Sequence, residues 1–300
     1  MEIILGLTAA LGWGVADFSA RFATRRIGAY RTLMLMQLFG FTALTLYLEK
    51  TGTFSHGFAW GRRAWTFAII AGLLNVVSSL SLYRSFELGT MSIAAPVSSA
   101  YPALTVGLAL LSGERINALR GAGLAITFIG MLLAAISFTR ERDLSLSEAK
   151  PLTEAENISS AHLSKGAGWA IIAAIGFGVM FWWLGFHVVP LVGSGISVWV
   201  IRLTSFLMLA LVGVPAGQTF NLPRGRIWLQ VAVIALADTT AFVCNNAGLG
   251  LGHVAVVSVI ASLYGAVTVL LSWIFLRERI DRSQWLGILL IFCGIVLVSL

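Results

Sequence analysis

The sequence predicts an all-α integral membrane protein with ten transmembrane helices, arranged as two inverted five-helix repeats. Three observations support this prediction: the composition, the number of apolar segments, and a duplication inside the chain. Of the 300 residues, 58% are hydrophobic and only 11% are charged, and the mean hydropathy is +0.90. Soluble domains carry roughly a quarter charged residues. Helices that are apolar all round are therefore expected to face lipid.

A membrane span needs about 20 mostly apolar residues, and ten segments approach this length. The first follows a single charge, Glu2, and lacks the basic start of a signal peptide, so it is interpreted as a span. The last is short and is expected to stand upright or to thin the bilayer locally. The ten segments are Ile3–Ala20, Thr32–Leu48, Trp65–Phe86, Ser92–Ser112, Leu119–Phe138, Gly166–His187, Gly195–Val214, Ile227–Leu249, Val254–Leu276 and Trp285–Leu300.

One long polar segment divides these spans into two groups of five. Residues 139–165 are rich in both acidic and basic side chains and are typical of a linker between domains. The expected organisation is a first repeat over residues 1–138, the linker over 139–165, and a second repeat over 166–300.

The two groups share short motifs at a nearly constant spacing. Ala-Ala-Leu-Gly-Trp-Gly-Val at 9–15 returns as Ala-Ala-Ile-Gly-Phe-Gly-Val at 173–179, and Gly12 matches Gly176 at 176 − 12 = 164. Glu-Arg-Ile at 114–116 returns at 278–280 with the same offset. Tyr101 matches Tyr264 at 264 − 101 = 163. Because each repeat has an odd number of spans, the second must lie upside down relative to the first, an architecture typical of transporters.

These motifs resemble the drug/metabolite transporter superfamily, specifically its ten-helix EamA-domain branch. The resemblance rests on the Gly-Trp-Gly of the first span, the Glu-Arg-Ile after the fourth and ninth, and the glycine-spaced fifth and tenth. It implies transport of small metabolites, often amino acids, while some relatives exchange sugar phosphates or nucleotide sugars. The family usually has proline in the ninth span, where this chain has Val259 and Gly265 opposite Pro96 and Pro102. A symmetric role of the two helices is therefore not expected from the sequence.

The predicted location is a bacterial-type inner membrane, with both termini on the same side. The side stays open, because two arguments disagree. Most Lys and Arg residues between spans lie opposite the termini, so the positive-inside rule places the termini outside. The resemblance implies termini in the cytoplasm.

Asp238 is the strongest candidate for chemistry, because an ionisable group within a span is costly. It lies midway along the eighth span, and its repeat counterpart is Asn75 in the third (238 − 163 = 75). Two polar groups near the membrane midplane at the repeat interface are expected to line a substrate site. Asp238 would bind a proton or the ammonium group of a substrate. The alternative is a structural ion pair with Arg202.

Further substrate-binding candidates share a helix face with these residues or lie in the interrupted spans. Pro96 and Pro102 are expected to kink the fourth span and release carbonyl groups. Packing roles remain the alternative for each aromatic or hydroxyl candidate, and Asp17 is assigned by preference to a local ion pair with Arg21. The candidates, besides Asp238 and Asn75, are Trp13, Ser79, Ser98, Tyr101, Trp182, Asn245, Ser262 and Tyr264.

The expected function is secondary transport, in the export direction, of small metabolites such as amino acids by alternating access with possible proton coupling. The expected partners are a small-molecule substrate and the lipid bilayer, with the oligomeric state open. No enzyme, cofactor, metal or nucleic-acid motif is found in the sequence. The alternatives are a membrane-embedded lipid-processing protein or flippase, and an exchanger of sugar phosphates or nucleotide sugars.

Overall fold

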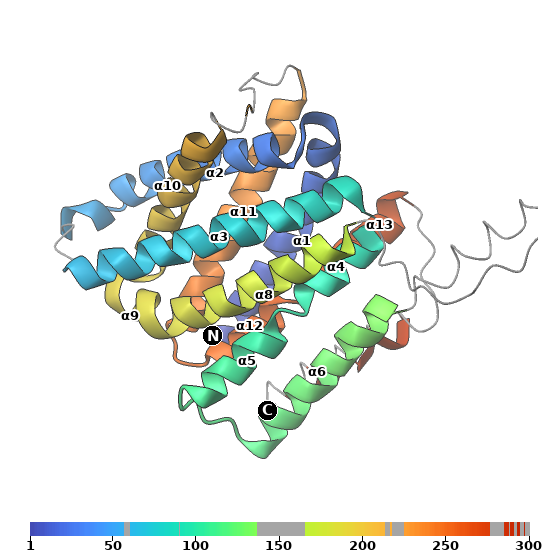
Figure 1. Ribbon diagram of the computed structural model, residues 1–300. Helices are drawn as coiled ribbons and strands as arrows, with labels where there is room; N and C mark the ends of the chain where they lie inside the picture. Colours follow the sequence, from blue (N-terminus) through green and yellow to red (C-terminus); the bar gives the residue numbers. More distant parts are fainter. Residues whose placement is uncertain are drawn as a thin grey trace, which may run out of the picture.

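The computed structural model describes residues 1–56, 61–89, 91–136, 166–213, 217, 225–276, 285–287, 289–290, 293–294 and 297. Throughout these residues the regular secondary structure is helical (Figure 1). Eight segments among them are long and apolar enough to cross a membrane. The linker, most of the tenth predicted span and the C-terminal end lie outside the described residues. The expectation that both termini share a side therefore stays a prediction.

The described residues of the first half form six α-helices and a short 3-10 turn at Thr53–His56. The helices are α1 (Glu2–Ile27), α2 (Ala29–Lys50), α3 (Arg62–Leu88), α4 (Met91–Ser99), α5 (Pro102–Leu111) and α6 (Ala118–Ile136). The fourth predicted span consists of α4 and α5 together. The fifth corresponds to α6, whose apolar part, Ala118–Gly130, is shorter than the eight spanning segments.

The second half follows the same plan. Its helices are α8 (Ala167–Trp183), α9 (Val189–Val192), α10 (Ser194–Gly213), α11 (Ile227–Leu249), α12 (Val254–Ala261) and α13 (Tyr264–Leu276). A π-helical turn at Leu184–Val188 joins α8 to α9 within one spanning segment. The ninth predicted span consists of α12 and α13.

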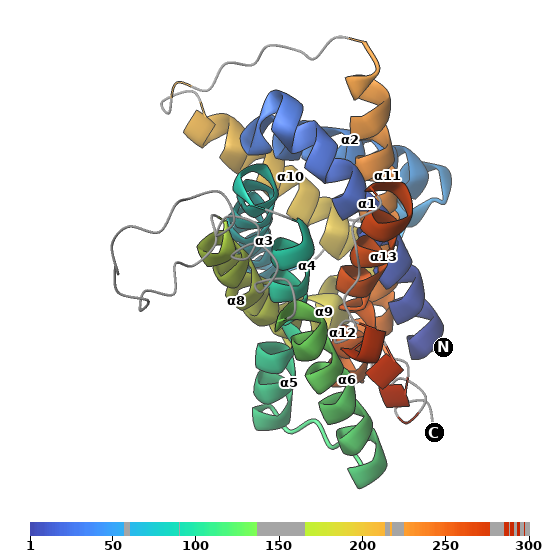
Figure 2. The same ribbon diagram turned by 90° about the vertical axis from the view of Figure 1, so that its right-hand side faces the viewer.

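The two halves pack through reciprocal pairs of helices. The helix α1 packs along α11, and its repeat counterpart α8 packs along α3, the counterpart of α11 (Figure 1). Likewise α4 packs against α13, and α5 packs against α12. Figure 2 shows α5, α6 and α12 grouped toward the lower end of the bundle. Exchanging the halves therefore maps the main contacts onto one another.

Both the fourth and the ninth spans are interrupted at matching positions. The break between α4 and α5 falls at Ala100 and Tyr101, and that between α12 and α13 at Ser262 and Leu263. At both breaks a backbone hydrogen bond joins residues three apart instead of four. The Tyr101 N–H donates to the Ser98 carbonyl at 3.4 Å, and the Leu263 N–H donates to the Ile260 carbonyl at 3.2 Å. The break in the ninth span was not expected, because that segment has no proline there.

Serine hydroxyls accompany both breaks. Ser98 donates to the Ala95 carbonyl at 3.0 Å, and Ser262 donates to the Val259 carbonyl at 2.7 Å. Such bonds to the preceding turn compete with the helical pattern and bend helices. Pro96 lies inside α4 and Pro102 is the first residue of α5. Both breaks are thus accompanied by a serine, but only the break in the fourth span also has prolines beside it.

The Gly-x-Gly motif explains how the long helices approach so closely. A Cβ added to Gly12 would lie 2.8 Å from the Ala241 Cβ on α11. The counterpart Gly176 lies against Ser78 on α3, and Ser78 corresponds to Ala241 (241 − 163 = 78). Small residues let helix backbones come together in membranes.

The second glycine of each motif packs against a broken span. Gly14 lies against Val267 and the Tyr264 carbonyl on α13. A Cβ on Gly178 would lie 2.8 Å from the Leu104 Cβ and 2.9 Å from the Tyr101 carbonyl. Trp13 and Phe177, the aromatic residues between the glycines, therefore each lie between two close helix contacts.

Replacing Gly178 with alanine should therefore destabilise the protein. The new methyl group meets the backbone of Tyr101, which cannot move without shifting α5. A methyl group added to Gly168 in the same helix would have nothing within 4 Å, so Gly168→Ala should be neutral or slightly stabilising, by about 0.5–1 kcal/mol. Apparent melting temperatures of both purified variants in detergent check this, and equal values for the two would contradict the packing role of Gly178.

Glu114, the first residue of the Glu-Arg-Ile motif, binds the start of α12. Its two carboxylate oxygens accept hydrogen bonds from the Ala255 N–H at 3.1 and 3.2 Å. An acceptor at this position satisfies a backbone donor of the first turn and interacts favourably with the helix dipole. Burial is the main influence on Glu114 and raises the pKa of its carboxyl above the ordinary 4.5, partly opposed by the Ala255 N–H and by His253.

The raised pKa gives the stability a defined pH dependence. Because folded Glu114 holds its proton more tightly than unfolded Glu114, its titration favours folding below about pH 4.5 and this gain is lost as the pH rises through the folded pKa. The melting temperature of the wild type minus that of Glu114→Gln should therefore decrease as the pH rises from acidic to neutral. A difference that does not change with pH would show that the pKa of Glu114 is not raised.

Candidate functional site

A small cavity lies where the two halves meet. Its volume of about 40 Å³ is room for a few water molecules. Residues of both repeats line it: Trp13, Asp17, Met36, Asn75, Ser79, Leu82, Tyr83, Tyr101, Phe177, Met180, Phe181, Asp238, Phe242 and Tyr264. A molecule of amino-acid size would need the surrounding helices to move apart.

Most of these lining residues form pairs related by the repeat. Five pairs keep the offset found in the sequence, three at 163 and two at 164 (177 − 13 and 181 − 17). The pairs are Trp13 with Phe177, Asp17 with Phe181, Asn75 with Asp238, Ser79 with Phe242, and Tyr101 with Tyr264. The cavity is therefore assembled from equivalent positions of the two halves.

Tyrosines from the two helix breaks meet at the centre. The rings of Tyr101 and Tyr264 are stacked, with centroids 6.4 Å apart and an interplanar angle of 12°. Tyr101 donates its hydroxyl to the Ser258 carbonyl at 2.9 Å, and the Tyr264 and Ser98 hydroxyls are 3.1 Å apart. Each break is thus tied to the opposite broken span.

Further rings surround the two tyrosines. Phe181 lies 4.9 Å from Tyr101 and 5.4 Å from Trp13, between ring centroids. Phe242 lies 6.0 Å from both Trp13 and Phe181. These separations are typical of tilted and edge-to-face aromatic pairs. Aromatic residues thus make up half of the cavity lining.

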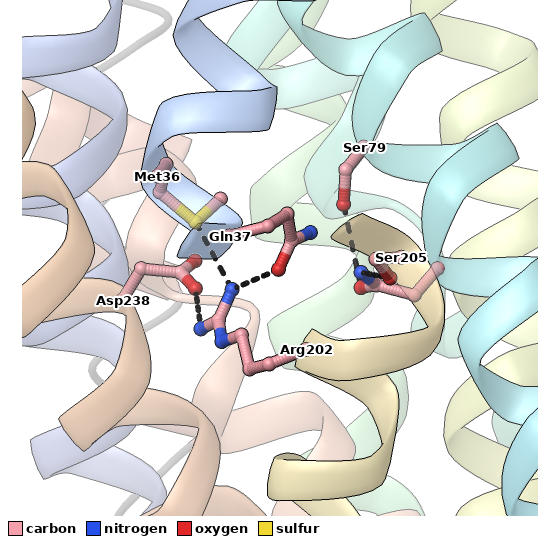
Figure 3. Close-up of polar contacts among 7 residues, drawn as sticks. Met36, Gln37, Ser79, Arg202, Ser205 and Asp238 are labelled. Carbon is pink, nitrogen blue, oxygen red and sulfur yellow. Dashed lines mark hydrogen bonds and ion pairs between the residues drawn. The ribbon is translucent and has the colours of Figure 1, made fainter. Parts of the chain in front are cut away.

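Asp238 forms an ion pair with Arg202 at the edge of the cavity (Figure 3). The Arg202 side chain is 1% exposed, and it also donates to the Gln37 carbonyl oxygen at 2.9 Å and contacts the Met36 sulfur at 3.0 Å. Asp238 is 17% exposed and also lines the cavity. Of the two interpretations of Asp238, the structure shows the ion pair, and the carboxylate keeps access to the cavity.

Asn75, the counterpart of Asp238, belongs to a second polar group. Its amide donates to the Ser205 hydroxyl at 3.0 Å, and Ser79 donates to its carbonyl oxygen at 3.3 Å (Figure 3). Ser205 lies on α10, one turn beyond Arg202. One helix therefore orients both polar members of this repeat-related pair.

The two sides of the cavity differ in charge. We define the acidic wall as Trp13, Asp17, Asp238 and Phe242, which belong to the adjoining helices α1 and α11. The neutral wall consists of their counterparts Phe177, Phe181, Asn75 and Ser79, on α8 and α3. Both carboxylates of the cavity thus lie on one wall.

Asp17 lines the cavity and is 5% exposed, which corrects the interfacial pair with Arg21 expected from the sequence. Seven further lining residues were not among the predicted candidates: Met36, Leu82, Tyr83, Phe177, Met180, Phe181 and Phe242. The repeat could have revealed two of them, since Phe177 and Phe242 are the counterparts of the candidates Trp13 and Ser79.

Four sequence-derived candidates lie outside the cavity lining. Ser98 and Ser262 bind helix carbonyl groups at the breaks. Asn245 is fully buried and its amide lies 3.5 Å from the Asn246 side chain. It is seven residues from Asp238, about 10 Å along the helix, and so lies beyond the cavity.

Trp182, the fourth, is displaced from the cavity by helix packing. Its indole N–H donates to the Ser112 hydroxyl at 2.8 Å. Gly178, one turn earlier on the same face, packs against α5, where Thr105 donates to its carbonyl at 2.9 Å. The face of α8 that contains 178 and 182 therefore turns toward α5, and Phe177 and Phe181 face the cavity.

Within the part of the chain that the structure describes, no group of three or more His, Cys, Asp or Glu side chains is suited to holding a metal ion. Among the same residues, the cavity lining contains no Lys or Arg. The chemistry available to a bound molecule thus consists of two carboxylates, hydroxyl and amide groups, and aromatic rings.

The eight apolar spans and the cavity between two related halves define a multi-pass membrane protein with a central site. The chain belongs to the EamA-like transporter family, whose model matches it twice, over residues 1–136 and 164–300. It is therefore a membrane transporter of small solutes.

Two individual proteins are similar to this chain. An uncharacterized protein of Methanocaldococcus jannaschii, MJ1333.1, is 31% identical over 136 residues, which are 45% of this chain and 96% of that protein. A protein of known crystal structure is 18% identical with a TM-score of 0.72, and the match covers 99% of this chain and 96% of the other. The second similarity concerns the fold alone.

The Arg202–Asp238 pair should show strong energetic coupling. Asp238→Asn leaves a guanidinium that is 1% exposed without its counter-ion, whereas Arg202→Met leaves a carboxylate with access to the cavity. Breaking one partner of a buried pair costs about 3–5 kcal/mol. Asp238→Asn should therefore lower the apparent melting temperature more than Arg202→Met, and the double variant should lose less than the sum of the two. Simple additivity would mean that the pair contributes no coupling.

Proposed function

We propose that this protein is a secondary transporter that exports small metabolites, with amino acids as the leading class, by alternating access. The observation that carries the proposal is the cavity at the centre, lined by five repeat-related pairs and tied together at two helix breaks. A duplicated wall provides two packings of similar energy, which is the requirement for opening a site to either side. The proposed location is the inner membrane.

The proposed architecture is ten spans in two inverted repeats, with domains over residues 1–138 and 166–300 joined by the linker over 139–165. The reciprocal pairing of α1 with α11 and of α8 with α3 supports this arrangement. So does the double match of the family model. The relative MJ1333.1, matched over 96% of its length by 136 residues of this chain, has roughly the length of one repeat.

We further propose that Asp238 takes part in proton coupling. Its carboxylate touches the cavity and is paired with Arg202, so protonation would release the guanidinium and change the contact between α10 and α11. The alternative exchangers of sugar phosphates or nucleotide sugars receive little support, because phosphate binding commonly uses Arg or Lys and none lines the described cavity.

A lipid-directed function is the second candidate, favoured by a separate groove. This cavity of about 590 Å³ is lined by residues from α2, α3, α8 and α10, including Tyr30, Trp169 and the ion pair Arg84–Glu87 at 2.9 Å. Aromatic and basic groups beside apolar helices suit a lipid headgroup. Movement of fluorescent phospholipids between leaflets of reconstituted vesicles, absent from empty vesicles, would favour this function.

The main test is counterflow in liposomes that contain the purified protein. Vesicles loaded with unlabelled amino acid should accumulate labelled neutral and aromatic amino acids, and empty liposomes should not. Asp238→Asn should abolish the pH dependence of transport, whereas Glu49→Gln, which neutralises an exposed carboxylate at the end of α2, should retain it. Because Asp238→Asn leaves Arg202 without its counter-ion, each variant is first checked for a single elution peak.

The outcomes separate the claims. Unchanged pH dependence in folded Asp238→Asn would remove Asp238 from the coupling mechanism. Absence of any amino-acid counterflow by folded protein would overturn the amino-acid assignment.

A further inference from the structure

Asp17 is a buried carboxylate for which the described residues provide no counter-ion. It is 5% exposed and lines the cavity. Within the described residues it accepts no hydrogen bond and forms no ion pair, in contrast to Asp238. An ionised carboxylate in such surroundings is costly unless a positive charge accompanies it. When Asp17 is ionised, it therefore has no counter-ion among the described residues.

Aromatic rings surround this carboxylate. Asp17 lies one turn after Trp13 on α1, and Tyr83 and Tyr264 line the same cavity. Trp13 and Tyr264 are 6.2 Å apart, edge to face. Ring faces attract cations, most strongly when water is excluded. A carboxylate beside several rings is a suitable environment for an ammonium group.

The same cavity offers little to a negatively charged group. None of its described lining residues is Lys or Arg, and the nearby Arg202 is engaged by Asp238, Gln37 and Met36. A zwitterionic amino acid would have to bring its carboxylate close to two others. A simple amine would neutralise Asp17 and place its apolar part against Phe177 and Phe181.

We infer that this cavity selects organic cations, and that Asp17 with the surrounding rings binds the ammonium group of an apolar or aromatic amine. The inference rests on the proposed transport function and replaces amino acids with amines as the leading substrate class. Asp17 contacts the substrate directly, whereas Asp238 is held by Arg202.

A proton should compete with the amine for Asp17. The charged and titratable groups that face it are Asp238 on α11, Arg202 behind Asp238, Tyr83 on α3 and Tyr264 on α13. Asp238 interacts with Asp17 as a like charge. Acidification should therefore weaken amine binding, while the amine itself stays charged.

The test is equilibrium binding by calorimetry to the purified full-length protein in detergent. Phenethylamine, phenylalanine and phenylpropionate have the same ring and differ in their charged groups. We expect phenethylamine to bind at least about tenfold more tightly than the other two. We expect Asp17→Asn to weaken phenethylamine binding at least about tenfold, and the matched carboxylate control Glu49→Gln to leave it unchanged.

Three results would overturn the inference: phenylalanine binding as tightly as phenethylamine, folded Asp17→Asn binding like the wild type, or amine binding by the wild type that does not change with pH. The pH dependence of binding needs no variant, so this measurement tests the inference even if Asp17→Asn fails to fold. Counterflow of the same compounds distinguishes this inference from the proposed transport. Transport of phenylalanine but not of phenethylamine would refute only the inference, whereas amine binding without transport of any compound would refute only the proposed function.

Discussion

The close approach of helices at the paired glycines is the constraint on which the rest of the structure depends. Gly12 and Gly14 bring α1 against α11 and α13, and Gly176 and Gly178 bring α8 against α3 and α5. Lipid provides no hydrophobic driving force between helices, so such contacts rely on close packing. Because the residue between each glycine pair is large, the same contacts direct Trp13 and Phe177 into the centre.

The broken helices complete this arrangement. Backbone carbonyls at the breaks survive in the membrane interior because they are buried in protein and accept hydrogen bonds from serine and tyrosine hydroxyls. Tyr101 and Tyr264 each reach the opposite broken span. Movement at one break is therefore mechanically linked to the other through two side chains.

The sequence could predict the eight described spans, the repetition of the two halves and the placement of Asn75 and Asp238 in one cavity, since these follow from hydropathy and from a constant offset. It could not predict which face of α8 meets the cavity, because Gly178 and Trp182 share a face that turns toward α5. The break in the ninth span could not be predicted either, since it contains serine and no proline. Asp17 was misplaced because its spacing from Arg21 suggested a local pair, and only the packing of α1 on α11 shows what faces it.

The acidic and neutral walls have a consequence for the balance between two open forms. A cavity with identical halves would face either side of the membrane with equal free energy, because inversion would map one form onto the other. Here Asp17 and Asp238 stand opposite Phe181 and Asn75, so the two forms bury different amounts of charge. Under the proposed alternating access, the empty transporter would rest preferentially in one orientation, and a cation that neutralises the acidic wall would lower the difference in free energy. In that mechanism, a few side chains of the cavity lining would set the resting preference.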